Sequence, residues 1–147
     1  MYKALALAAL LAVPTFADAG RFGLAFLERY TIPVNPIDAT TFETVEANGA
    51  GGTQLWCAAA IYTILVMGVD RGNLYIKEAR GASQTMQGRK GVVFTTQEVP
   101  GASKSYSEGV REAGKTFSIG HADALCRSGN VGDVAIRLPS GQLVRRW

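Results

Sequence analysis

The chain has 147 residues, of which 48% are hydrophobic and 18% are charged, a balance that excludes an intrinsically disordered protein. Its formal net charge is +3 at pH 7, and the basic residues are scattered, apart from the pair Arg145 and Arg146 beside Trp147. A surface that binds nucleic acid needs a dense basic cluster, so no nucleic-acid partner is expected.

Residues 1–19 have the three parts of a bacterial export signal. Lys3 provides the positive charge, residues 4–13 form an uncharged run rich in Ala and Leu, and Pro14 ends that run. Ala17-Asp18-Ala19 then matches the small-x-small pattern that signal peptidase cleaves, so Gly20 is the expected first residue of the mature protein. We therefore expect a periplasmic or secreted protein.

Residues 20–41 are predicted to form an N-terminal extension, followed by a single domain over residues 42–147. Pro33 and Pro36 remove backbone donors and favour an extended path ahead of that domain. Residues 42–46 alternate between apolar and polar side chains, with the period of a half-buried strand. The glycine-rich segment that follows is expected to end this strand.

Residues 55–67 form a predominantly apolar run without a charged side chain, between Thr53 as the expected helix N-cap and Gly68 as the expected C-cap residue. A helix over residues 55–69 rises only about 22 Å, which is shorter than the roughly 30 Å hydrocarbon core of a bilayer. A buried core helix is therefore favoured over a membrane span, and no stable membrane span is expected after cleavage of the signal.

The rest of the chain is predicted to contain short strands, one loop and a second helix. The expected strands cover residues 73–77, 91–96, 134–138 and 143–147, and the last two form a hairpin. Residues 98–115 are rich in Ser, Gly, Lys and Glu and are expected to form an exposed loop, while residues 122–127 form a short helix. This order predicts an α+β fold: a small antiparallel sheet packed on one buried apolar helix, plus a short second helix.

Cys57 and Cys126 are the only two cysteines of the chain. An even number of cysteines in an oxidising compartment is ordinarily paired, so we predict a disulfide between them. Cys57 is expected in the first turn of the core helix, and Cys126 near the end of the short helix. The bond would close a loop of about 70 residues, for which the chain-entropy model gives about 4 kcal/mol of stabilisation.

An alternative hypothesis makes Cys57 a nucleophile. The chain order of its companion residues resembles that of papain-like and peptidoglycan-cleaving cysteine hydrolases. In those enzymes a helix N-terminus stabilises the thiolate, a histidine accepts its proton, an acid or amide orients the imidazole, and an upstream amide donates to the oxyanion. The corresponding residues here are Cys57, His121, either Asp123 or Asp133, and Gln54. The sequence departs from that pattern, because Trp56 precedes the cysteine and Ala58 follows it.

The sequence predicts neither a dinucleotide-binding site nor a metal site. Gly49, Gly51 and Gly52 lack the third glycine of a dinucleotide fingerprint, and the preceding strand carries Glu43 and Glu46 where that fold needs apolar residues. One histidine and two paired cysteines do not supply the usual nitrogen and sulfur ligands of a metal. We therefore predict no cofactor and no metal site.

Five segments resemble a group of small exported bacterial proteins of unknown function. They are the helix start Trp56-Cys57-Ala58-Ala59, the strand 74–76, the turn Gly81-x-Ser83, the strand 93–95 and the distal Cys126. The resemblance spans roughly residues 42–127. It implies one export-dependent, disulfide-containing domain, and it implies no activity.

Our first expectation for function is a small non-enzymatic protein that acts after export. It would bind a protein partner or an envelope component through the loop 98–115 and the basic C-terminus, and no catalytic residue is assigned. The alternative is a cysteine hydrolase that cleaves peptide or peptidoglycan bonds with Cys57 and His121.

Overall fold

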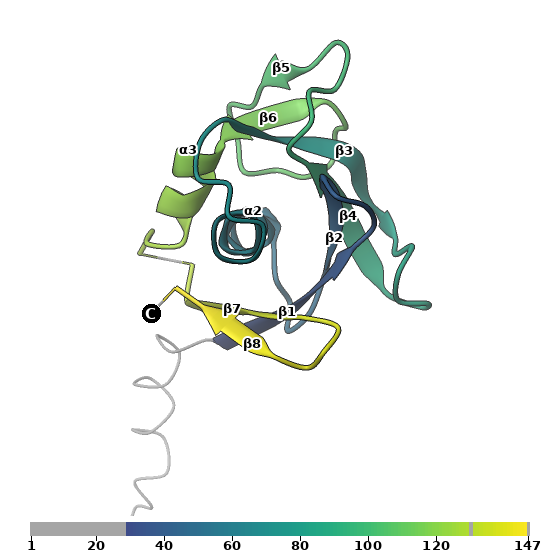
Figure 1. Cartoon of the computed structure of the whole chain (residues 1–147), viewed down its shortest axis with the longest axis vertical. Helices are drawn as coiled ribbons and strands as arrows, with labels where there is room; N and C mark the ends of the chain where they lie inside the picture. Colours follow the sequence, from purple (N-terminus) through teal and green to yellow (C-terminus); the bar gives the residue numbers. More distant parts are fainter. Residues whose placement is uncertain (1–28, 130, 147) are drawn as a thin grey trace, which may run out of the picture.

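The protein is described by a computed structural model over residues 29–129 and 131–146, so the predicted signal peptide lies outside the described residues. A buried helix packed on a sheet confirms the predicted α+β class (Figure 1). In chain order the elements are β1 (Arg29–Pro36), β2 (Thr41–Val45), α2 (Gly52–Ile61), η2 (Tyr62–Val66), β3 (Asn73–Ala82), β4 (Lys90–Thr95), β5 (Ser103–Lys104), β6 (Lys115–Ser118), α3 (Ile119–Leu125), β7 (Asp133–Arg137) and β8 (Leu143–Arg145).

The eight described strands form one sheet in the order β5-β6-β3-β4-β2-β1-β7-β8. Most neighbours are antiparallel, but β1 pairs with β7, and β5 with β6, in parallel. The sheet is therefore mixed, whereas the sequence predicted an antiparallel one. A parallel pair needs a long crossover connection, and the chain between β1 and β7 supplies one that contains both helices.

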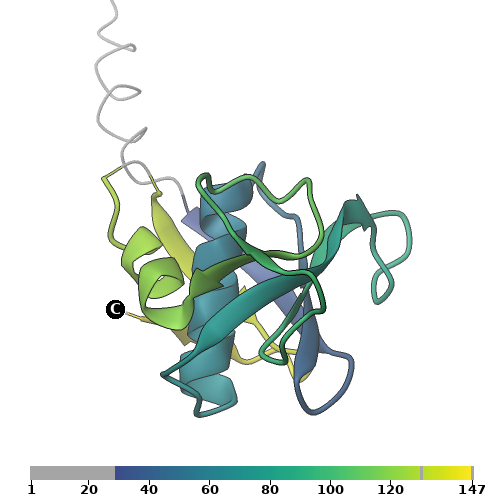
Figure 2. The same cartoon turned by 90° about the horizontal axis from the view of Figure 1, so that it is seen from above.

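Helix α2 lies at the centre of the molecule. Figure 1 looks along this helix and shows the sheet curving around it, with α3 on the remaining side. All eight residues from Gln54 to Ile61 are buried. A helix that is apolar on every face requires such surroundings, and the three consecutive alanines 58–60 leave room for close approach by the surrounding elements. Figure 2 shows the same helix from the side, with α3 packed along it.

The helix begins at Gly52 with Gly51 as the N-cap, two residues before the predicted start, because Thr53 is already helical. After Ile61 the chain continues into the π-helical turn η2, in which the Met67 N–H donates to the Tyr62 carbonyl at 3.0 Å. Gly68 follows with a φ of +74°, which confirms its predicted role in ending the helix.

Strand β1 lies within residues 20–41, which the sequence predicted as an extension outside the domain. Its residues Tyr30, Ile32 and Val34 are buried in the core. Residues 29–33 pair with β7 and residues 34–36 pair with β2, so each half of the strand has a ladder on one side only. Proline is tolerated where one side of a strand is unpaired, which is why Pro33 and Pro36 do not exclude this segment from the sheet.

The region predicted as an exposed loop, residues 98–115, is more ordered than expected. It contains β5, and its last residue begins β6, a strand that the sequence analysis did not predict. Within it Ser105 and Val110 are buried. The Val110 carbonyl accepts from the Arg80 N–H at 2.9 Å, and the Gly114 N–H donates to the Ile76 carbonyl at 2.8 Å, so the segment is fastened to β3.

Candidate functional site

The predicted disulfide is present between Cys57 and Cys126, with a Cα–Cα distance of 4.9 Å. Cys57 is fully buried in α2, in its second turn rather than in the predicted first turn. Cys126 is the C-cap residue of α3. The bond therefore joins the central helix to the helix that covers its open side, across 69 residues of sequence.

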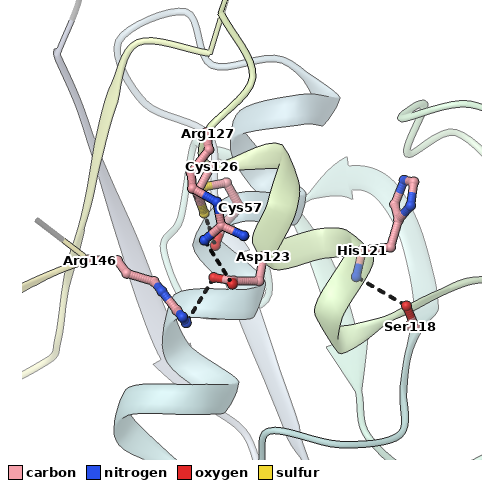
Figure 3. Close-up of polar contacts among 7 residues, drawn as sticks. All are labelled: Cys57, Ser118, His121, Asp123, Cys126, Arg127 and Arg146. Atoms are coloured by element: carbon pink, nitrogen blue, oxygen red, sulfur yellow. Dashed lines mark hydrogen bonds and ion pairs between the residues drawn. A yellow bond between two sulfur atoms is a disulfide. The ribbon is translucent and has the colours of Figure 1, made fainter.

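His121 lies on the other side of α3 from the disulfide, as the close-up in Figure 3 shows. Its side chain is exposed, its ring contacts that of Phe117 at a tilt of 32° with 4.3 Å between centroids, and its backbone N–H donates to Ser118 Oγ at 3.1 Å. The structure thus brings Cys57 to Cys126 and not to His121, and the sulfur that a hydrolase would use is bonded.

The other residues of the hydrolase hypothesis have structural contacts instead. Gln54 Oε1 accepts from the Gly51 N–H at 2.9 Å, and its Nε2 donates to the Val131 carbonyl at 3.1 Å, so this side chain fastens the start of α2. Asp123 is buried and forms ion pairs with Arg127 at 3.3 Å and Arg146 at 2.9 Å, as drawn in Figure 3.

The two arginines of the basic C-terminus both form ion pairs with described residues. Arg146 pairs with Asp123, and Arg145 pairs with Asp133 at 2.8 Å, a carboxylate that Arg29 also approaches at 3.9 Å. Asp123 also pairs with Arg127, so four arginines share two carboxylates and the cluster stays net positive. The C-terminal arginines are thus already engaged in ion pairs that an anionic partner would have to displace or share.

Glu43 is a buried carboxylate that the sequence analysis did not single out. Its side chain on β2 is 1% exposed and accepts hydrogen bonds from the segment that follows β3. The donors are the hydroxyls of Ser83 and Thr85 and the backbone N–H groups of Gln84 and Thr85. We call this arrangement the Glu43 clasp. It holds the end of the β3–β4 hairpin against the sheet.

A glycine makes room for the clasp. A side chain at Gly91 on β4 would place its Cβ 2.6 Å from Glu43 Oε1, which is too close for any real contact. Alternation along residues 42–46 could not reveal the burial of Glu43, since the segment that covers it lies some forty residues further along the chain. The spacing Ser83-x-Thr85 and the small residue at 91 were the only signals available.

Residues 105–114, which we call the Tyr106 loop, display the most exposed large side chain among the described hydrophobic residues. Tyr106 is 92% exposed, although the neighbouring Ser105 is only 5% exposed and donates from its hydroxyl to the Ser107 carbonyl at 2.6 Å. The loop also rests on α2: a Cβ at Gly52 would lie 1.9 Å from the Glu108 carbonyl oxygen. An ordered backbone thus holds an aromatic ring out in solvent.

Two hollows flank this loop, and both are lined by Ser105, Tyr106 and Ser107. The first has a volume of about 660 Å³ and extends to the start of α2 and to Arg80, Arg111 and Lys115. The second, of about 600 Å³, extends over Phe117 and His121. Both volumes fall in the range of small-molecule sites. We call them the basic hollow and the aromatic hollow.

Arg80 is committed to an ion pair at the edge of the basic hollow. Its Nε donates to Glu46 Oε2 at 2.6 Å and its Nη2 to Glu46 Oε1 at 3.0 Å. These hydrogen bonds hold the pKa of Glu46 below its ordinary value. Arg111, by contrast, is exposed and forms no ion pair with any described residue, which leaves its charge available to a ligand.

A third and smaller hollow of about 370 Å³ lies beside the disulfide, where Arg146 and Asp133 line it. Within residues 29–129 and 131–146, no three His, Cys, Asp or Glu side chains gather so as to hold a metal ion. Among the same residues, no helix combines the length and apolar composition needed to cross a bilayer.

Comparisons of the chain with protein-family models, with curated proteins and with solved structures found no match.

Proposed function

We propose that this is an exported, non-enzymatic protein of the periplasm or the extracellular space that binds a component of the cell envelope through the Tyr106 loop. The observation that carries the proposal is the exposure of Tyr106 on a fastened backbone. A large aromatic side chain that is 92% exposed contributes almost no hydrophobic burial to the stability of the fold. It is well suited to become buried when a ligand binds.

Three features of the loop support a binding role. Its backbone is held to β3 and to α2, so that little conformational entropy is lost when a ligand is bound. The hollows on its two sides offer concave surface next to the ring. Arg111 adds a positive charge without an ion-pair partner among the described residues, which favours an anionic envelope component.

Export is supported by the disulfide and by the signal pattern of the sequence. Disulfides persist in oxidising compartments and are rare in the cytosol. Protein exported by a Gram-negative host is expected to begin at Gly20 when its N-terminus is sequenced, because the small-x-small pattern ends at Ala19. Folded protein recovered from the cytoplasm with Met1 in place, and none from the periplasm, would contradict export.

Replacement of Tyr106 tests the binding role. Co-sedimentation of the mature protein with isolated envelope fragments is expected to fall about tenfold in Tyr106→Ala, because the variant loses the ring that the ligand would cover. The free energy of unfolding, measured by denaturant unfolding, should stay within about 0.5 kcal/mol of the parent, as for other surface changes.

Matched variants make the result specific. Tyr106→Phe keeps the ring and should retain most of the binding. Leu143→Ala removes another exposed hydrophobic side chain, 43% exposed on the edge strand β8, and should bind like the parent. Equal co-sedimentation of parent and Tyr106→Ala would overturn the proposal. Binding that disappears after protease treatment of the fragments would identify a protein partner instead.

A further inference from the structure

The two hollows beside the Tyr106 loop differ in chemistry. The aromatic hollow combines ring faces with many short polar side chains, and its lining residues include Asn73, Tyr106, Thr116, Phe117, Ser118 and His121. The rings of Phe117 and His121 are in contact at a tilt of 32°, and His121 is exposed to solvent while Phe117 is buried. Such a lining offers flat apolar faces and neighbouring hydrogen-bond donors and acceptors.

The lining of the two hollows together is more positive than negative. The lining contains four basic residues and two acidic ones: Arg80, Lys104, Arg111 and Lys115, and Glu108 and Glu112. Glu46 neutralises Arg80, and Glu112 lies 3.6 Å from Lys115. Lys104 and Arg111 are exposed and form no ion pair with a described residue. They lie in different hollows, Arg111 in the basic hollow and Lys104 in the aromatic hollow, where Lys104 is accompanied by Glu108, a carboxylate that also forms no ion pair with a described residue.

We propose that the ligand of the Tyr106 loop is an oligosaccharide that carries carboxylate groups. This inference rests on the proposed function and names the chemical class of the envelope component. A sugar ring has an apolar C–H face that packs on an aromatic ring and a rim of hydroxyls that bind short polar side chains, and the aromatic hollow supplies both. Carboxylates on the chain would then pair with Arg111 and Lys104.

The shape of the surface favours an extended ligand over a small one. Tyr106 lines both hollows, so a ligand that covers its ring continues into concave surface on either side. A polymer of sugar units can place one unit on the ring and its neighbours in the two hollows. An apolar lipid chain fits less well, because hydroxyl and charged groups line both hollows and would lose their hydration.

Calorimetric titration with two defined probes tests this inference. The acidic probe is a hexamer of galacturonic acid, and the neutral probe is a hexamer of N-acetylglucosamine. The parent is expected to bind the acidic hexamer at least about fivefold more tightly at low salt, and high salt should remove that preference because it screens the charges. Tyr106→Ala should weaken both probes about tenfold, while Tyr106→Phe should bind like the parent.

Arg111→Gln separates the charge from the stacking. It should reduce affinity for the acidic hexamer and leave the neutral hexamer unchanged, since only the first presents carboxylates. Equal affinity for the two probes at low salt would overturn the carboxylate part of the inference. If neither hexamer binds while Tyr106-dependent co-sedimentation with envelope fragments persists, the ligand is not a saccharide and the proposed function stands. If the co-sedimentation also fails, both proposals are wrong.

Discussion

Cys126→Ala is expected to lower the free energy of unfolding by about 4 kcal/mol, the largest effect of any single change considered for this protein. The disulfide removes conformational freedom from the unfolded chain by closing a loop of 69 residues in sequence, and this term grows with loop length. Domains of this size are ordinarily stable by only about 5–15 kcal/mol. Denaturant unfolding of the oxidised parent and the variant, monitored by tryptophan fluorescence, measures the difference.

Two controls identify the cause of that loss. The parent with its disulfide reduced should unfold close to Cys126→Ala, because both lack the same cross-link. His121→Ala should lose less than about 1 kcal/mol, since its exposed ring contributes one tilted ring contact with Phe117. Titration of unfolded protein should find no free thiol before reduction and two after it. A Cys126→Ala protein as stable as the oxidised parent would contradict this account.

Glu43→Gln is expected to lower the free energy of unfolding by about 2–3 kcal/mol. The substitution keeps the volume of the side chain but turns one acceptor oxygen into an NH₂ group, which then faces donors instead of accepting from them. Glu43 itself is only 1% exposed, so the new NH₂ group is buried and faces donors where the carboxylate had accepted hydrogen bonds. Denaturant midpoints at neutral pH measure the loss.

A neighbouring glutamate provides the matched control. Glu78 on β3 also accepts from Gln84, but it is exposed, so Glu78→Gln should change stability by less than about 0.5 kcal/mol. Gly91→Ala approaches the clasp from β4 and should also destabilise, because its Cβ would displace the Glu43 carboxylate. If Glu43→Gln were as stable as Glu78→Gln, the clasp would not hold the hairpin.

Local sequence was a good guide wherever a segment's own pattern determines its structure. The core helix, its end at Gly68 and the strands near residues 42–46, 73–77, 91–96, 134–138 and 143–147 all follow from apolar periodicity and turn residues. The disulfide followed as well, because two cysteines allow only one intramolecular pairing. None of these predictions required knowledge of which segments become neighbours.

Apart from the start of α2, the predictions that differed from the structure depend on distant segments. Strand β1 joins the sheet because β7, about a hundred residues later, supplies its partner, and its two prolines concealed that pairing. Residues 98–115 gained their order from contacts with β3 and α2. No property of those two segments alone could have placed them correctly.

The sequence by itself determined the single disulfide pairing, the central apolar helix and the α+β class, because composition, periodicity and cysteine count act locally or leave one choice. Only the tertiary structure decided that Cys57 lies away from His121, that Arg145 and Arg146 are already paired, and that Tyr106 stands exposed between two hollows. Those facts depend on which elements the curved sheet brings together, and long-range packing sets that arrangement.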